Sequence, residues 1–254
     1  MGYYDFLKKI INKLINKFKK KRNLLNYIKK QNINKFNKCS AASRSQLGQD
    51  LFVLDKLNFA SKGFFVEFGV CDGIMLSNTF MLEKEFNWSG IVCEPSNTYQ
   101  DALKKNRHCH IESKCVFSES GKNLYFTETK LGELSFLNDY RPNDQFLSNN
   151  EYTKERMNGK TYKVKTISLN DLLKKYNCPR IFDYLSIDTE GTEYEIIKNL
   201  NFDMFSPKII TIEHNYNEVE RSKIYNLLTK HNYSRVLKEV SCWDDWYVKK
   251  DLIN

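Results

Sequence analysis

The chain has 254 residues, of which 41% are hydrophobic and 28% are charged, with a formal net charge of +9. These values are typical of a soluble globular protein with one domain and an extension, or with two small domains. They exclude an integral membrane protein, because no stretch reaches the ~18 consecutive apolar residues of a membrane span.

The first residues lack the basic segment, the apolar segment and the cleavage site of a secretory signal, so we expect none. The seven cysteines are odd in number and form no C-x-x-C motif. This pattern indicates neither a zinc ribbon nor a disulfide framework. A reducing compartment fits such free thiols best, so we expect a cytoplasmic protein.

The basic charge is concentrated in residues 1–38, which hold twelve Lys and Arg residues and one acid, Asp5, whereas the remainder holds 28 basic and 30 acidic residues. A nucleic-acid enzyme usually spreads basic charge around its active face, so nucleic acid is not an expected partner. Apolar residues at steps of three and four predict that residues 1–44 form a basic amphipathic helical arm. They are Phe6, Leu7, Ile10, Ile11, Leu14, Ile15 and Phe18. Three roles stay open for the arm: packing on its own domain or on a second subunit of a homodimer, peripheral binding to an anionic membrane surface, or a mostly disordered extension.

From residue 45 to residue 254 the sequence alternates between strand and helix patterns. Expected strands are 63–69, 90–95, 115–117, 184–188, 208–213, 235–237 and 246–248, and expected helices are 76–86, 96–105 with Ser96 as N-cap, 192–200 and 219–231. This alternation predicts one α/β domain with a Rossmann-like, doubly wound, mostly parallel sheet of seven strands and an antiparallel C-terminal strand. The polar segment 128–160 breaks the alternation, which favours a lid or binding loop.

Polar residues follow the first two expected strands, where ligands of an open parallel sheet bind. Glu67, Gly69, Asp72 and Gly73 form an acid-x-Gly-x-x-Asp-Gly pattern, which differs from the dinucleotide fingerprint G-x-G-x-x-G. The glycines allow a sharp turn close to a ligand, and the acid suits a cationic amino-acid group better than a pyrophosphate. Glu94 ends the second strand, where an acid chelates the two hydroxyls of a ribose.

Two further strands end in Asp188-Thr189-Glu190-Gly191 and in Glu213-His214. We expect these strands to be neighbours, so that their polar groups converge on one crevice. Buried carboxylates need partners, so packing alone is a poor explanation for them. They indicate either a general base toward a substrate hydroxyl or ligands of a divalent metal.

Together, these segments resemble the FkbM family of class I methyltransferases over residues 45–248. The matching stretches are, in order, 45–50, 66–73, 76–79, 90–95, 166–172, 186–191 and 212–213. Residues 1–38 lie outside the resemblance. It implies transfer of a methyl group from S-adenosylmethionine, usually to a hydroxyl, and many relatives act on sugars or natural-product scaffolds.

The resemblance also implies a role for individual residues. The cofactor would be covered by Gln46, Gln49 and Asp50, and its methionine and ribose portions would be surrounded by Glu67, Gly69, Asp72, Gly73 and Asn78. Glu94 would hold the ribose, and Ser118 and Glu119 would lie near adenine. Asp188, Glu213 and His214 would face the acceptor, with Asp188 or His214 as the base. Related macrolide-sugar O-methyltransferases hold a divalent metal at the corresponding strand ends. Asp188, Glu213 and His214 are therefore candidate ligands for Mg²⁺ or Mn²⁺, although His214 stands where a second acid is expected.

The acceptor-binding candidates are Tyr140 and Arg141, in the polar segment 128–160. The hydrogen-bonding residues of this segment suit a sugar or a nucleotide-linked sugar, for example of a surface glycan such as a capsular polysaccharide. Three alternatives stay open. An RNA methyltransferase could use the basic arm as a clamp, although the chain has no Asn/Asp-Pro-Pro-Tyr/Phe motif; a nicotinamide dehydrogenase is disfavoured by the missing G-x-G-x-x-G; and a non-catalytic scaffold would not need the acids at the strand ends.

Overall fold

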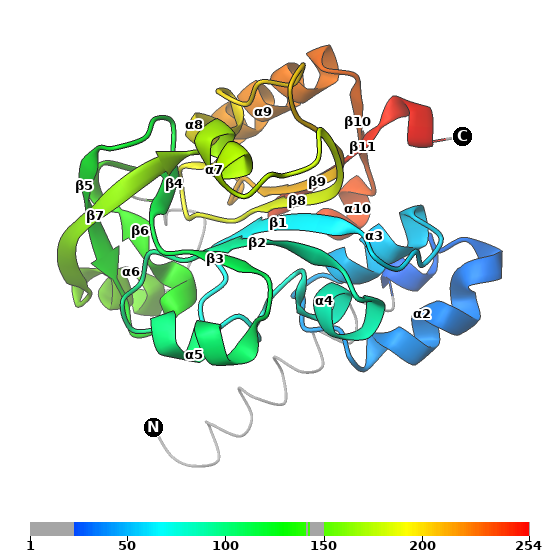
Figure 1. The fold of residues 1–254 in the computed structure, drawn as a ribbon, viewed down its shortest axis with the longest axis horizontal. Coiled ribbons are helices and arrows are strands. Elements are labelled where there is room, and N and C mark those ends of the chain that lie inside the picture. Colours follow the sequence, from blue (N-terminus) through cyan, green and yellow to red (C-terminus); the bar gives the residue numbers. More distant parts are fainter. Residues whose placement is uncertain (1–22, 141, 143–149, 254) are drawn as a thin grey trace.

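Seven strands form the main sheet of the computed structural model, which describes residues 23–140, 142 and 150–253. Their order is β10-β11-β9-β8-β1-β2-β3 (Figure 1). The strands are β1 (Phe64–Phe68), β2 (Ser89–Cys93), β3 (His110–Glu112), β8 (Ile181–Ile187), β9 (Ser206–Glu213), β10 (Tyr233–Val236) and β11 (Asp244–Lys249). β3, β2, β1, β8 and β9 are parallel, whereas β11 is antiparallel to both of its neighbours. This topology confirms the predicted seven-stranded, mostly parallel sheet.

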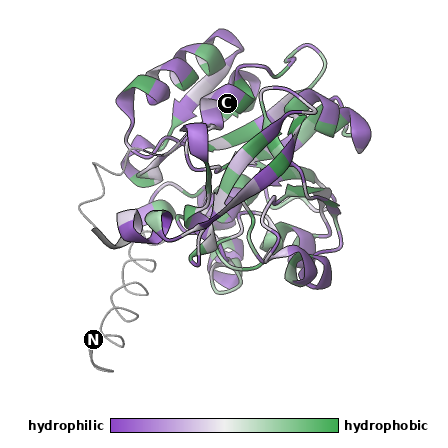
Figure 2. Cartoon of the chain, turned by 90° about the vertical axis from the view of Figure 1, so that its left-hand side faces the viewer, coloured by the Kyte–Doolittle hydropathy of each residue, from purple (hydrophilic) through white to green (hydrophobic). Residues whose placement is uncertain are grey.

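Helices cover both faces of the main sheet (Figure 1). One face packs against α7 (Leu169–Lys175), α8 (Glu193–Ile197) and α9 (Glu218–Lys230), and the other against α2 (Ile33–Ser40), α3 (Gln49–Lys56), α4 (Phe80–Phe86), α5 (Gln100–Asn106) and α10 (Lys238–Ser241). Hydrophobic residues gather on the central strands, and the helices alternate hydrophobic and hydrophilic residues (Figure 2). None of the helices in the described ranges is long and apolar enough to cross a membrane.

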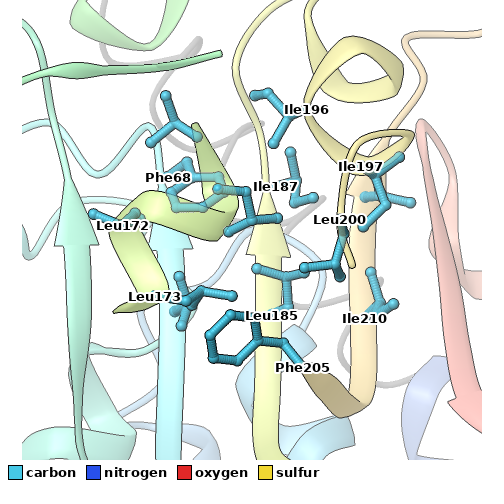
Figure 3. Packing of buried hydrophobic residues seen from close by; sticks show 14 of the residues in the cluster. Phe68, Leu172, Leu173, Leu185, Ile187, Ile196, Ile197, Leu200, Phe205 and Ile210 are labelled. Atoms are coloured by element: carbon cyan, nitrogen blue, oxygen red, sulfur yellow. The ribbon is translucent and has the colours of Figure 1, made fainter. Parts of the chain in front are cut away.

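The first apolar layer fixes the strands whose ends carry the expected chemistry. Leu172 of α7 and Ile196 of α8 lie against Leu185 of β8 and Ile210 of β9 (Figure 3). All four residues are fully buried. Burial of such a side chain stabilises a fold by roughly 1.5–3 kcal/mol. The ends of β8 and β9 are therefore held rigidly side by side.

Part of the predicted arm packs on the domain. Leu24, Ile28 and Phe36 are buried in the second apolar layer. Asp55 of α3 accepts hydrogen bonds from the Lys29 backbone N–H at 3.1 Å and from the Asn32 side chain at 2.8 Å. The amphipathic helix predicted over residues 6–18 lies outside the described residues.

A second sheet, in the order β4-β7-β5-β6, lies at one end of the main sheet (Figure 1). We call it the inserted sheet. It consists of β4 (Cys115–Phe117), β5 (Asn123–Glu128), β6 (Phe136–Leu137) and β7 (Lys160–Ser168), and α6 (Asn150–Met157) precedes β7. The prediction that residues 115–117 form the third strand of the main sheet was therefore wrong. The side chains of Cys115 and Phe117 lie in the separate core of the inserted sheet, whereas Val116 packs into the core of the main sheet. The polar β3 takes the edge of the main sheet, where a short polar strand is tolerated.

The polar segment 128–160 contains more regular structure than its sequence suggested, because the 3-10 helices η2 (Gly132–Leu134) and η3 (Asn138–Tyr140) flank β6 and α6 follows. The strands β5 and β7, which border the segment, pair in antiparallel register. β7 alternates exposed Lys163 and Lys165 with buried Val164 and Thr166. That alternation is typical of a half-buried strand and was a usable signal.

Two helices begin later than predicted. α4 begins at Phe80 rather than at residue 76, because residues 77–79 donate hydrogen bonds to the carboxylate of Glu67. α5 begins at Gln100, with Tyr99 rather than Ser96 as its N-cap. The Ser96 backbone N–H instead donates to Glu94 Oε1 at 2.8 Å. Both deviations lengthen loops at the carboxyl ends of β1 and β2.

Candidate functional site

A cavity lies at the carboxyl ends of the central strands. The main sheet and its loops contribute Gln46, Glu67, Phe68, Gly69, Cys71, Met75, Leu76, Asn78, Cys93, Glu94, Pro95, Asp188, Thr189, Glu190 and Thr192. The inserted sheet contributes Cys115, Val116, Phe126, Gly132, Glu133, Ser135 and Leu137. The cavity therefore lies between the carboxyl-terminal edge of the main sheet and a wall formed by the inserted sheet.

The Glu67 carboxylate organises the turn after β1. It accepts hydrogen bonds from the Asn78 backbone N–H at 2.5 Å, from Ser77 Oγ at 2.9 Å and from Thr79 Oγ1 at 2.5 Å. Its Oε2 also lies 3.7 Å from Arg107 Nη1. Glu67 thus has hydrogen-bond donors and a shared positive charge within the protein, and it also lines the cavity, so its contact with the cationic end of a ligand stays a prediction.

Gly69 lets two strand ends approach each other. Its φ is +72°, in the left-handed region, and a Cβ at this position would lie 2.0 Å from the carbonyl oxygen of Asp188. Only glycine combines this backbone conformation with such a close backbone contact. Gly69 thus brings the turn after β1 against the end of β8.

We expect Gly69→Ala to lower the free energy of unfolding by at least about 1–3 kcal/mol, since left-handed strain and a backbone clash act together. Gly121→Ala is the matched control, because Gly121 has a φ of +84° and no heavy atom within 4 Å of an added Cβ. Chemical denaturation of both variants would measure the difference. Equal losses would show that the contact with Asp188 does not matter.

Glu94 stands at the end of β2 and is 5% exposed. Its Oε2 accepts from the Cys71 backbone N–H and its Oε1 from the Ser96 backbone N–H, both at 2.8 Å. Burial raises the pKa of Glu94 to about 7, although these two hydrogen bonds favour the charged form. Two backbone donors leave lone pairs on both oxygens for a pair of ligand hydroxyls.

Three carboxylates meet at the ends of β8 and β9. Asp188, Glu190 and Glu213 each offer an oxygen, and these oxygens lie within 4.8 Å of one another. Burial raises the pKa of Asp188 and Glu213 well above their ordinary values, and the neighbouring carboxylates raise it further. Glu213 Oε2 is buried without a hydrogen-bond partner among the described residues. We call these three residues the acidic cluster.

Arg156 connects the acidic cluster to the inserted sheet. Its guanidinium is fully buried and lies 2.9 Å from Glu190 Oε2. The same oxygen accepts from Asn215 Nδ2 at 3.2 Å, and Arg156 Nη1 also donates to the Leu134 carbonyl at 2.9 Å. Glu190 is thus the member of the cluster whose charge is already compensated.

His214 is oriented by other groups. Its Nδ1 accepts from the Tyr216 backbone N–H at 3.0 Å, and its Nε2 lies 3.8 Å from Asp245 Oδ1. Burial lowers the pKa of His214, which favours neutral imidazole at pH 7. The structure brings Glu190, rather than His214, to Asp188 and Glu213.

The structure divides the remaining predicted residues between the cavity and its support. Gln46 and Asn78 line the cavity. Four others hold the loops around the cavity in place. Gln49 donates to Asp244 Oδ2 at 2.8 Å, and Asp50 accepts from Ser43 Oγ at 2.7 Å and from Ser45 Oγ at 2.6 Å. Asp72 accepts from the Ile74 and Met75 backbone N–H groups, and Gly73 packs against Leu103 and Arg107.

Ser118 and Glu119, which directly follow β4, are not among the residues that line the cavity, although Cys115 and Val116 of β4 are. The Glu119 side chain is 60% exposed and pairs with Lys122 at 3.5 Å. A Cβ on Gly191 would lie 2.4 Å from the Tyr140 carbonyl oxygen, so the Tyr140 backbone packs directly on the end of β8. Arg141 lies outside the described residues.

The sequence analysis missed Arg107, Arg156 and Glu133. Arg107 follows Lys104 and Lys105 in what reads as a solvated basic run, yet its side chain is fully buried. Arg156 and Glu133 belong to the segment without clear periodicity. No local signal distinguishes these residues, because distant elements of the fold create their environments.

Comparison with known proteins places these features in a family. Residues 67–235 match the family model of the methyltransferase FkbM domain. Three solved structures are similar: a methyltransferase FkbM from Methylobacillus flagellatus KT (11% identity, 86% of this chain and 59% of that chain, TM-score 0.46), a precorrin-6y C5,15-methyltransferase from Geobacter metallireducens GS-15 (10%, 78% and 84%, 0.39) and a putative RNA methyltransferase from Pyrococcus horikoshii (11%, 75% and 69%, 0.35). No curated protein sequence matches the chain.

Proposed function

The chain belongs to the FkbM family of methyltransferases, and from this premise we propose that it transfers a methyl group from S-adenosylmethionine to a hydroxyl of a sugar or nucleotide-linked sugar. The observation that carries the proposal is the joint placement of Glu94 and Asp188 on one cavity. Glu94 suits a ribose, and Asp188 suits the oxygen that must lose a proton. Asn78, Gln46 and the turn at Gly69 are the proposed surroundings of the rest of the cofactor.

The chemistry needs alignment and one proton acceptor. The acceptor oxygen attacks the methyl carbon, the S–C bond breaks, and S-adenosylhomocysteine leaves with the bonding electron pair on sulfur. We assign the proton to Asp188, because its raised pKa brings the carboxylate closer to the basicity that such a transfer needs. Positioning the hydroxyl in line with the S–CH₃ bond supplies much of the rate.

The acidic cluster fits a divalent cation. Carboxylate oxygens are the ligands that Mg²⁺ and Mn²⁺ prefer, and the unpartnered Oε2 of Glu213 is a buried acceptor without a donor in the described part of the chain. We propose Asp188, Glu190 and Glu213 as the ligands, so that Glu190 takes the place expected for His214. A bound cation would polarise the acceptor hydroxyl.

Calorimetric titration with S-adenosylmethionine and S-adenosylhomocysteine tests the cofactor. We expect the native protein to bind both and Glu94→Ala to weaken binding by on the order of 100-fold or more, since each lost hydrogen bond to a carboxylate is worth about 1.5–3 kcal/mol. Because the pKa of Glu94 is about 7, protonation removes the acceptor as the pH falls. Native affinity should therefore decrease from about pH 8 to about pH 6, whereas Glu94→Gln should show no such trend.

Glu85→Ala is the control for this experiment, because that side chain is exposed on α4 and does not line the cavity. It should bind like the native protein. Absence of binding by the native protein, with Mg²⁺ or Mn²⁺ present, would overturn the proposal. Once binding is established, a screen with labelled cofactor would compare neutral sugars, nucleotide-linked sugars and RNA, and methylation of RNA alone would replace the sugar by a nucleic-acid acceptor.

A further inference from the structure

The inserted sheet completes an apolar slot in the cavity. Phe126 of β5 and Leu137 of β6 line it from the inserted sheet, together with Cys115 and Val116 of β4. Cys93 lines it from the end of β2, directly before Glu94. A flat, weakly polar base needs apolar walls of this kind next to the ribose site. The slot therefore lies where the adenine of a nucleoside held by Glu94 would extend.

The expected acceptors for the polar edge of adenine are displaced from this slot. Ser118 and Glu119 follow β4, but neither lines the cavity. The Glu119 carboxylate is exposed and pairs with Lys122. A buried amino group without an acceptor would lose binding energy, because it gives up its hydrogen bonds to water. Another residue must supply the acceptor.

Glu133 of η2 offers one. It lines the cavity, and its Oε2 is buried without a hydrogen-bond partner in the described ranges of the chain. An ionised carboxylate accepts hydrogen bonds only, so it matches a donor on the ligand. A buried carboxylate oxygen that lacks a donor is unfavourable unless a ligand supplies that donor.

The segment that carries Glu133 is fixed on several sides. A Cβ on Gly132 would lie 2.3 Å from the ring of Tyr99, so the backbone packs directly on that ring. Arg156 Nη1 donates to the Leu134 carbonyl at 2.9 Å, and the Leu131 backbone N–H donates to Glu155 Oε1 at 3.1 Å. These contacts hold the carboxylate in place before any ligand arrives, which reduces the entropic cost of binding.

The neighbours of Glu133 belong to the ribose end of the cavity. Tyr99 is the N-cap of α5, the helix that follows Glu94. Burial raises the pKa of the Tyr99 hydroxyl, and the charges of Glu133 and Glu94 both raise it further.

We infer that Glu133 Oε2 accepts a hydrogen bond from the exocyclic N6 amino group of adenine and makes the cavity selective for adenine over hypoxanthine. This inference rests on the proposed function, because it requires the adenosyl cofactor. It assigns cofactor recognition to the inserted sheet as well as to the main sheet. In hypoxanthine an oxygen replaces the amino group, so this oxygen and the Glu133 carboxylate, both hydrogen-bond acceptors, would face each other.

Calorimetry with S-adenosylhomocysteine and S-inosylhomocysteine tests the inference. The native protein should prefer the adenosine compound by at least about tenfold, which corresponds to about 1.4 kcal/mol. Glu133→Gln should lose or reverse this preference, because its amide can donate to the hypoxanthine oxygen. Glu85→Gln is the matched control, because Glu85 is exposed on α4 and does not line the cavity, and it should keep the native preference. Thermal unfolding of each variant checks that its fold is intact.

The outcomes separate the two claims. Native binding without discrimination, or a Glu133→Gln variant with native discrimination, would overturn the role of Glu133 and leave the proposed function standing. An equal loss of affinity for both compounds in Glu133→Gln would also overturn it, because it would place Glu133 at the ribose. If the native protein binds neither compound, the proposed function and this inference both fail.

Discussion

Replacing Asp188 by asparagine is expected to reduce methyl transfer by roughly 10²–10⁴-fold while making the protein without bound cation more stable. The loss of rate follows from removal of the proposed base. The gain in stability follows from the acidic cluster, where burial and neighbouring carboxylates raise the pKa of Asp188 above its ordinary value of 3.8. Binding of S-adenosylhomocysteine should stay within a few-fold of native, because Glu94 is intact.

The sign of the stability change depends on pH. A carboxyl group whose pKa is raised by folding contributes stability below its unfolded pKa and loses that contribution as the pH rises through the folded pKa. The advantage of Asp188→Asn over the native protein should therefore be absent near about pH 4 and grow as the pH rises toward about 8. Thermal unfolding in a metal chelator measures it. Mn²⁺ should stabilise the native protein and not the variant.

Asp203→Asn is a suitable control, because Asp203 is exposed in the turn between α8 and β9. It should alter neither turnover nor stability. Native rates in Asp188→Asn would remove Asp188 from the mechanism. A less stable variant at every pH would show instead that Asp188 holds the strand ends together.

Replacing Arg107 by methionine is expected to lower the free energy of unfolding by about 3–5 kcal/mol. The fully buried guanidinium donates to Glu83 Oε2 at 2.7 Å and to Thr79 Oγ1 at 2.8 Å, and it lies 3.7 Å from Glu67 Oε2. Methionine would leave the buried Glu67 carboxylate without its arginine partner and Glu83 with only Lys84, whose Nζ lies 3.4 Å from Glu83 Oε1. In a domain of this size the melting temperature should fall by roughly 6–20 °C.

The variant should also bind S-adenosylhomocysteine more weakly, because Arg107 Nη1 donates to the Gly73 carbonyl and to Ser77 Oγ, both in the turn after β1. Lys104→Met removes an exposed positive charge from the preceding helix and serves as the control. Arg107→Lys keeps the charge and loses the planar fork, so it should fall between the two. If Arg107→Met were as stable as Lys104→Met, the buried network would not stabilise the turn.

Six of the seven strands of the main sheet were predictable because each carries its own evidence, whereas the polar β3 was missed. β1, β2, β8 and β9 are short apolar runs that end in acids or glycine, and the same polar ends identified Glu94, Asp188 and Glu213. The position of β4 was not predictable. Cys115–Phe117 is apolar in either sheet, and only the pairing of these residues with Thr166–Ser168 decides between them.

The partners of the site residues were less predictable than the residues themselves. Glu67 was identified, but its compensation by Arg107 depends on a residue 40 positions away that looks solvated in the sequence. His214 was grouped with Glu213 because the two are adjacent in sequence. Successive side chains at the end of a strand point to opposite sides, which explains why Glu213 joins the acidic cluster and His214 lies near Asp245.

The parallel pairing of β4 with β7 has a consequence for engineering. The excursion over residues 118–159 connects two neighbouring strands of the inserted sheet, and β5 within it pairs with residues 160–165 of β7. An exchange of this excursion between homologues therefore also needs a β7 that pairs with the donor's β5. Phe126, Glu133 and Leu137 of this excursion line the cavity. The proposed site therefore predicts that a chimera takes on the cofactor affinity of the donor protein together with its acceptor range. Directed evolution toward a new acceptor in this scaffold therefore needs simultaneous selection for cofactor retention.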